Sequence, residues 1–185
     1  MSRFAEYRSK NEICPSVHSA SELVIRMGQE SDGPALAAIA AEREGTSQAV
    51  EATAFRKFMR QSAETGRSIV LVAESRNVVV GFGKCIHFTP PLGAGVNTAP
   101  EGWYLMGVIV TPEFRRRGVG HQLTQARLNW VAQRASKAYY FVNAQNRVSI
   151  ELHRPFGFLE VTRDFSFPHV TFDGGTGILF QLNFA

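Results

Sequence analysis

GVIVTPEFRRRGVGHQL, residues 107–123, is the stretch of sequence that decides the fold. It opens with three consecutive β-branched residues at positions 108–110, which indicate a buried strand. Thr111-Pro112-Glu113 ends this strand, because proline cannot donate a hydrogen bond to a β-ladder. A turn with three arginines and two glycines follows, and a helical pattern begins at about Val119.

This order of strand, basic turn and helix suits the binding of a phosphate group. A helix N-terminus offers unpaired N–H groups and the positive end of the helix dipole. Glycines let a ligand approach the backbone closely, and arginines add charge-assisted hydrogen bonds. The stretch contains neither the P-loop pattern of nucleoside triphosphatases nor the Gly-x-Gly-x-x-Gly pattern of dinucleotide-binding folds, so another phosphate ligand is expected.

The composition is that of an ordinary globular protein. The chain has 185 residues, 44% of them hydrophobic and 19% charged, which predicts one domain at residues 22–185 behind a flexible tail at residues 1–21. The two cysteines, Cys14 and Cys85, lie far apart, so neither a disulfide framework nor a metal site is expected. The simple inference is a reducing cytoplasmic location, without a membrane span or a signal peptide.

The net charge of +4 is weakly basic. Because three arginines stand together in one turn, a local anion site is favoured over a nucleic-acid-binding face.

Hydrophobic periodicity and turn residues predict alternating helices and strands along the chain. Helices are expected at residues 33–44, 51–65, 119–136 and 146–154, and a long loop at residues 87–100. Strands are expected at residues 23–27, 68–73, 78–86, 103–110, 138–143, 159–172 and 178–184, the last two joined by a turn at residues 173–175.

A second informative pattern is Asn143-x-x-Asn146-x-x-Ser149-x-x-Leu152-His153-x-x-x-Gly157-Phe158. This pattern and Arg115-x-x-Gly118-x-Gly120 resemble the two signatures of the GNAT superfamily of acetyl-CoA-dependent N-acetyltransferases, over roughly residues 22–184. The resemblance implies an α/β fold with a single GNAT-like domain. Its central sheet is mixed and mostly antiparallel, with about six to seven strands, about four helices, and splayed fourth and fifth strands.

The resemblance also implies where acetyl-CoA binds and CoA is released. The backbone of Val108 and Val110 pairs with the pantetheine arm, and the N–H of Val110 polarises the thioester carbonyl. The pyrophosphate is held by N–H groups of residues 116–120 with a neighbouring arginine, and the pantetheine meets Asn146. The expected cofactor-binding residues are Val108, Ile109, Val110, Arg115, Arg116, Arg117, Gly118, Val119, Gly120, His121, Asn143, Asn146 and Ser149.

The amine acceptor must lose a proton, and the CoA thiolate must gain one. His153 stands where much of the family has a tyrosine acid, so it is either that acid or a histidine packed beside Pro155. Candidate bases are Glu101 and Tyr104, with His87 a third, and the alternative is a desolvated or water-wired amine without a dedicated base. Tyr104 shares a strand face with Val108 and Val110 provided that no bulge intervenes.

The acceptor is expected to lie against the loop after the first helix, the loop at residues 87–100 and the final hairpin. Glu44, Trp103 and Asp173 are the substrate-binding candidates, among acids that also include Glu42, Glu51 and Glu101. Carboxylates there favour a small cationic amine, with an aminoglycoside-type antibiotic as the leading candidate and therefore a role in antibiotic resistance. The alternatives are a protein or peptide N-terminus, and a non-catalytic acyl-CoA sensor. A homodimer is also expected, but no nucleic-acid or membrane partner.

Overall fold

Seven strands form one mixed sheet in the computed structural model, which describes residues 23–172 and 174–184. The strands are β1 Leu23–Met27, β2 Ser68–Ser75, β3 Val78–Phe88, β4 Gly102–Val110, β5 Lys137–Asn143, β6 Leu159–Thr162 and β7 Gly177–Asn183. Their order is β1-β2-β3-β4-β5-β7-β6, and only β4 and β5 are parallel neighbours. The expected α/β fold is therefore confirmed, whereas the tail at residues 1–21 lies outside the described residues.

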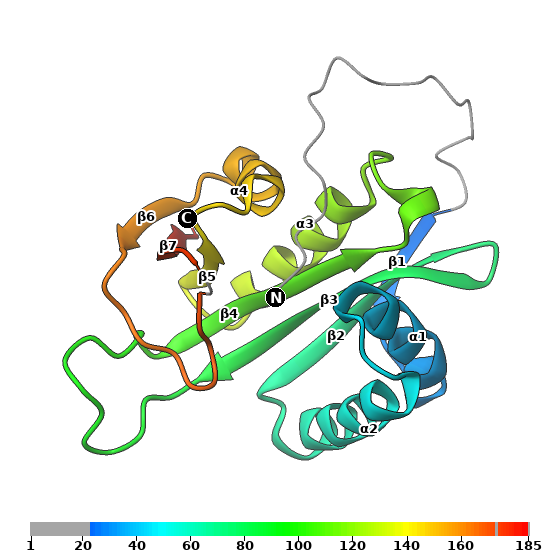
Figure 1. Ribbon diagram of the computed structural model, residues 1–185, viewed down its shortest axis with the longest axis horizontal. Helices are drawn as coiled ribbons and strands as arrows, with labels where there is room; N and C mark the ends of the chain where they lie inside the picture. The colour runs from blue at the N-terminus through cyan, green and yellow to red at the C-terminus, as the bar shows by residue number, and fades with distance from the viewer. Residues whose placement is uncertain (1–22, 173, 185) are drawn as a thin grey trace.

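Helices cover both faces of this sheet (Figure 1). They are α1 Gly33–Glu44, α2 Gln48–Thr65, α3 Val119–Ala132 and α4 Arg147–His153. On one face, α1 and α2 pack Leu36 and Phe55 against Phe82 of β3. On the other face, α3 buries Leu123 and Val131 in the largest apolar cluster of the described residues. The sheet thus holds the N-terminus of α3 at the end of β4, from which the chain enters it.

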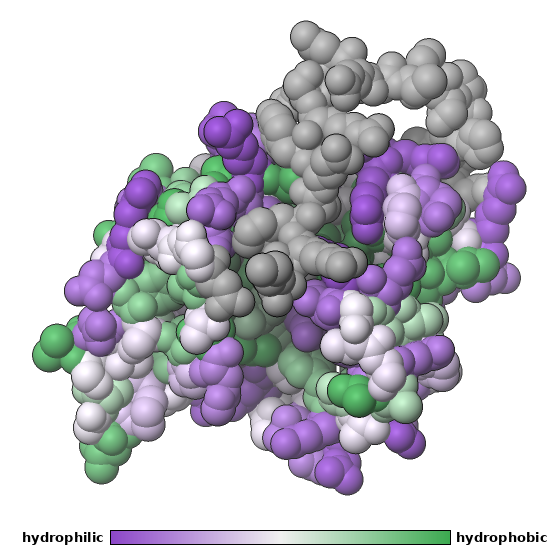
Figure 2. All heavy atoms as spheres, in the orientation of Figure 1, coloured by the Kyte–Doolittle hydropathy of each residue, from purple (hydrophilic) through white to green (hydrophobic). Residues whose placement is uncertain are grey.

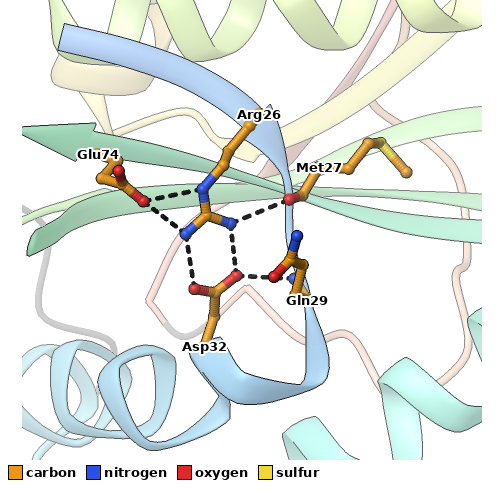
Figure 3. Close-up of polar contacts among 5 residues, drawn as sticks. All are labelled: Arg26, Met27, Gln29, Asp32 and Glu74. Carbon is orange, nitrogen blue, oxygen red and sulfur yellow. Dashed lines mark hydrogen bonds and ion pairs between the residues drawn. The ribbon is translucent and has the colours of Figure 1, made fainter. Parts of the chain in front are cut away.

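Figure 3 shows how the start of α1 is joined to the edge of the sheet. Arg26 of β1 donates two hydrogen bonds of 2.8 Å to the Asp32 carboxylate and two of 2.6 and 2.9 Å to Glu74 of β2. The Asp32 side chain also accepts from the Gln29 N–H rather than capping α1. Bidentate arginine–carboxylate pairs are among the stronger protein hydrogen bonds, so this cluster fixes α1 relative to β1 and β2.

The segment before β7 departs from the expected strand at residues 159–172. Only Leu159–Thr162 forms a strand. Further along, Phe165 and Phe167 pack on a cluster that contains Tyr104 and Tyr139, and the backbone of Ser166 bonds to Asn97 and Ala99 of the β3–β4 connection. The turn expected at residues 173–175 is partly described, since Gly174 has a φ of 63° and Asp173 lies outside the described residues. The chain between β6 and β7 therefore covers the sheet instead of forming a tight hairpin.

Two features of β4 shape the functional part of the fold. First, β4 pairs with β5 only at Trp103–Ala138 and Tyr104–Tyr139, so the two strands diverge towards their C-terminal ends, as expected. Second, Gly83 of β3 lies opposite Val108 and Lys84 lies opposite Met106, which leaves Gly107 as an extra residue. A one-residue bulge reverses the alternation of side chains along a strand.

The bulge places Tyr104 and Val108 on opposite faces of the sheet. Val108 packs with the α3 cluster, whereas Tyr104 belongs to the aromatic cluster on the other face. A shared face for Tyr104, Val108 and Val110 was expected only for a strand without a bulge, and the bulge at Gly107 removes that condition.

The surface combines hydrophilic and hydrophobic areas. In Figure 2, green spheres gather at the lower left, where Figure 1 places the connection between β3 and β4. Leu92 and Val96 of this connection are fully exposed. None of the described helices combines the length and the apolar character needed to cross a membrane.

Candidate active site

A cleft of about 1090 Å³ lies where β4 and β5 diverge. One wall is β4 from Leu105 to Val110, and the other is formed by residues 140–143 of β5 with α4. The basic turn and the first residues of α3 close one end. The splayed strands expose backbone groups that sheet pairing would otherwise occupy, so an extended ligand can hydrogen-bond there as an additional strand does.

The basic end of the cleft has the backbone of an anion site. Gly118 caps α3 with a φ of 81° and Arg116 has a φ of 63°, so the chain turns through two left-handed residues before the helix. A Cβ added to Gly120 would lie 3.5 Å from a Leu152 methyl group. The free N–H groups of the first turn of α3, next to Arg115 and Arg116 in the cleft lining, suit a pyrophosphate.

The three arginines of the turn have different surroundings. Arg115 and Arg116 line the cleft, and Arg115 Nε donates to the Val110 carbonyl at 3.0 Å. Arg117 lies over the Phe114 ring, 5.3 Å from its centre, and is not part of the cleft lining. His121 stacks on Phe156 and is likewise outside the lining. The structure thus brings two of the expected arginines into the cleft.

The opposite wall carries the polar residues of the second sequence pattern. Asn143 ends β5, and its Oδ1 accepts from the Gln145 N–H at 2.9 Å. Asn146 caps α4, and its Oδ1 accepts from the Ser149 N–H at 3.1 Å. All three expected residues of this wall, Asn143, Asn146 and Ser149, line the cleft.

His153 is buried at the cleft wall and is held as a neutral ring. Its Nδ1 lies 2.8 Å from the Ser149 carbonyl, which can only accept, so Nδ1 carries the hydrogen. Burial, together with the positive charge of Arg127, lowers the pKa of His153 to about 3. Among the described residues Nε2 has no hydrogen-bond partner. Nε2 is itself buried, so its lone pair is an unsatisfied acceptor beside the cleft.

The candidate bases do not line the cleft. The Tyr104 hydroxyl donates to the Pro100 carbonyl at 2.6 Å, and burial raises the pKa of Tyr104. Glu101 is exposed and accepts from Thr89. Burial and the nearby Arg67 lower the pKa of His87, despite an opposing effect of Glu101. Glu101 and Tyr104 stand at the start of β4, and His87 stands near the end of β3 opposite Trp103, so all three candidates are outside the cleft lining.

Another edge of the cleft is formed by the end of α1 and by the β6–β7 connection. Arg43 and Glu44 at the end of α1 line it, as do Thr171 and Phe172. The glutamate is close to Lys84, whose pKa is lowered by burial but raised in part by the charges of Glu51 and Glu44. Of the other two substrate-binding candidates, Trp103 is buried against Trp130, and Asp173 lies outside the described residues.

Sequence reasoning missed one residue of consequence near the site. The apolar spacing of Val119, Leu123, Ala126 and Trp130 predicts the core-facing side of α3, but Arg127, which is 0% exposed, is buried on that side as well. The spacing of four residues from Val119 through Leu123 to Arg127 was the available signal, because a charge in an apolar stripe is unusual.

A family model for the acetyltransferase (GNAT) family matches residues 35–158 of the chain. No curated protein matches the chain. Among solved structures, ribosomal-protein-alanine N-acetyltransferase from Brucella melitensis is 25% identical, with a TM-score of 0.68 and coverage of 87% of this chain and 99% of that one.

Two further structures share the fold at lower identity. The yncA protein from Salmonella typhimurium, solved with acetyl-CoA, is 21% identical, with a TM-score of 0.64 and coverage of 88% and 94% of the two chains. An acetyl transferase from Salmonella typhimurium that modifies the N-terminal serine of the 50S ribosomal subunit protein L7/L12 is 17% identical, with a TM-score of 0.68 and coverage of 90% and 97%.

Proposed function

The chain belongs to the GNAT family of acetyl-CoA-dependent N-acetyltransferases, and we propose that its acceptor is a primary amine on a small cationic molecule. The observation that carries this proposal is the cleft between β4 and β5, which has a basic helix N-terminus at one end and Glu44 at another edge. The sites for the acetyl donor and for the amine acceptor would then adjoin each other along the middle of β4.

The donor half of the cleft fits CoA in both charge and shape. The pyrophosphate would be held by N–H groups of residues 116–120, with Arg115 and Arg116 beside them. The backbone of Val108 and Val110 would pair with the pantetheine amides, opposite Asn146. When bound, acetyl-CoA supplies an acetyl group activated as a thioester. The Val110 N–H would donate to the thioester carbonyl oxygen and stabilise the negative charge that develops there.

His153 would contribute as a hydrogen-bond acceptor. The sequence suggested a proton donor at this position, but a ring that keeps its hydrogen on Nδ1 offers only a lone pair at Nε2. This atom would accept from an N–H of the pantetheine arm or from the S–H of the product thiol. The ring would therefore orient CoA, and the proton that the thiolate gains would come from elsewhere.

The amine proton would leave through water. Tyr104 and Glu101 remain base candidates only by way of a water chain, because neither lines the cleft. The acceptor would lie near Glu44, whose carboxylate attracts an ammonium group and stands on an exposed position of α1. An aminoglycoside or a polyamine has the required amines and charge.

A protein N-terminus is the second candidate acceptor. It is favoured by the likeness to the Brucella melitensis enzyme, which is described as acting on ribosomal-protein alanine. A peptide would need to enter along the edge formed by Thr171 and Phe172.

A thiol-release assay with acetyl-CoA separates these candidates. Aminoglycosides and polyamines would be compared with peptides that begin with alanine or serine, at equal amine concentration. We expect turnover with the cationic amines, and Glu44→Gln should raise their KM about tenfold, as the loss of one charge-assisted contact implies. The matched control is Glu64→Gln, at the exposed end of α2. Turnover with peptides alone, unaffected by Glu44→Gln, would establish the second candidate instead.

A further inference from the structure

Arg127 is a buried cation whose partners are almost all backbone carbonyls. Its Nη1 donates to the carbonyls of Met106 at 2.7 Å and Lys84 at 3.3 Å. Its Nε and Nη2 bond to Leu123 and Thr124 within α3. None of the ion pairs among the described residues includes Arg127. Burial lowers its pKa to about 10, so the guanidinium stays charged at neutral pH.

Burying such a charge costs free energy because the ion loses its hydration, so a buried arginine without an ionic partner calls for an explanation. The adjacent Cys85 gives no compensating charge, since burial raises the pKa of its thiol to about 11. An apolar side chain would fill the same place in α3 at lower cost. The polar contacts of Arg127 therefore indicate a role at β3 and β4, whose Lys84 and Met106 carbonyls it binds.

Those contacts coincide with the bulge of β4. Gly107 has no partner residue in the β3–β4 register. The carbonyls of Met106 and Lys84, the pair next to this bulge, both accept from Arg127 Nη1. β3 makes room for the guanidinium with Gly83, where an added Cβ would lie 2.9 Å from Arg127 Nε. The arginine thus occupies the position at which the ladder between the two strands is interrupted.

The Met106 carbonyl belongs to the same peptide unit as the Gly107 N–H. In a trans peptide the N–H points opposite to the C=O, so this N–H is directed away from Arg127. Gly107 is exposed and lines the cleft. A cation on the carbonyl polarises the peptide and makes its N–H a stronger donor.

We propose that Arg127 is a positioning residue for acetyl transfer: it clamps the Gly107 bulge and polarises the Met106–Gly107 peptide, so that β4 presents a fixed row of N–H donors to the cleft. This proposal rests on the proposed function of the cleft as the acetyl-CoA site. Arg127 acts through the backbone and does not touch the substrate. Its loss is therefore expected to impair the chemical step more than the binding of CoA.

Steady-state kinetics with Arg127→Gln and Arg127→Lys test whether the chemical step is impaired more than CoA binding. We expect kcat to fall about tenfold to a hundredfold in Arg127→Gln, with the KM for acetyl-CoA and the calorimetric Kd for CoA within threefold of the parent protein. Arg127→Lys keeps the charge but loses the planar fork, so it should recover part of kcat. The matched control is Arg134→Gln, since Arg134 lies just beyond the same helix, is exposed and stacks on Trp130. An equal kcat in Arg127→Gln and the parent overturns the proposal, as does a loss confined to CoA affinity.

A second variant and a spectroscopic measurement cover the case in which Arg127→Gln does not fold or the parent shows no turnover. Gly83→Ala crowds Nε without removing the charge. In the free protein, the amide signal of Gly107 should shift in Gly83→Ala and in Arg127→Lys, while the signal of Gly93, in the β3–β4 connection, stays in place. An unmoved Gly107 signal in both variants contradicts the proposal. An enzyme that binds CoA but acetylates no amine contradicts the proposed function, and the Gly107 signal still decides the role of Arg127.

Discussion

His153 of α4 stacks almost face to face on Tyr140 of β5, with ring centres 4.1 Å apart and an angle of 15° between the ring planes. Tyr140 in turn stacks on Phe180 of β7. The imidazole is thus one layer of an aromatic stack inside the protein, which explains why its protonation is strongly disfavoured. The stack fixes the ring plane of His153, which lines the cleft and whose buried Nε2 has no hydrogen-bond partner among the described residues.

The buried histidine predicts acid sensitivity. His153 has a pKa of about 3 when folded and about 6.5 when unfolded, so between these values the unfolded chain binds more protons. The free energy of unfolding therefore falls as the pH falls through this window, by about 2 kcal/mol between pH 7 and pH 5 from this residue. Urea unfolding at both pH values should show a smaller drop for His153→Phe. Equal drops in the two proteins would show that His153 is not buried as a neutral ring.

The left-handed Gly118 should be required for binding of the donor. Alanine at its φ of 81° is strained by about 1–2 kcal/mol, and relaxation would displace the N–H groups at the start of α3. We expect Gly118→Ala to raise the KM for acetyl-CoA about tenfold with little change in kcat. Gly93→Ala is a matched control, because Gly93 has a φ of 77° and similar free space but lies away from the cleft. A similar effect of both variants would assign the change to general destabilisation.

Tyr104→Phe should retain kcat within about threefold, because the bulge turns Tyr104 to the face opposite Val108. Loss of the hydrogen bond to Pro100 should lower the free energy of unfolding by about 1 kcal/mol. Glu101→Gln should likewise retain kcat. A hundredfold loss in either variant, with normal KM for acetyl-CoA, would identify that residue as the base and exclude direct release of the proton to water.

Arg26→Met should destabilise the fold without altering catalysis. It leaves the largely buried Asp32 carboxylate without its bidentate partner, which should cost about 1–3 kcal/mol and lower Tm by roughly 2–4 °C for each kcal/mol. Arg60→Met is the control, because the Arg60–Glu64 pair is exposed and spans 4.0 Å, and it should change the free energy of unfolding by less than about 0.5 kcal/mol. Equal losses would show that the Arg26 cluster contributes no more than a surface pair.

Local patterns were enough to predict most elements. The bounds of α1 and β1 agree with the structure, since apolar spacing and the glycine that follows α1 are local signals. The start of α2 was set too late because Ser47, whose hydroxyl accepts from the Val50 N–H, was not recognised as its cap. The signature that contains Gly118 and Gly120 and the one that contains Asn143 and Asn146 line the same cleft, as the resemblance implied.

The bulge at Gly107 and the burial of Arg127 were not predictable in the same way. Both involve contacts between residues of three different elements, namely Gly83 of β3, the Met106–Gly107 peptide of β4 and Arg127 of α3. Without the bulge, the alternation rule puts Tyr104 beside Val108. The error in strand β6 has a similar origin, since Phe167 packs on Tyr104 and Phe165 packs on Phe141 of β5, and no local pattern contains these contacts.

The central claim is that the cleft between β4 and β5 is the acetyl-CoA site, and a crystal structure of the protein with CoA tests it most directly. We predict that the pyrophosphate lies at the start of α3 beside Gly118, and that the pantetheine arm runs between Val108 and Asn146 with a donor group facing His153 Nε2. CoA bound elsewhere on the protein, with β4 and β5 unoccupied at saturating ligand, would contradict the account.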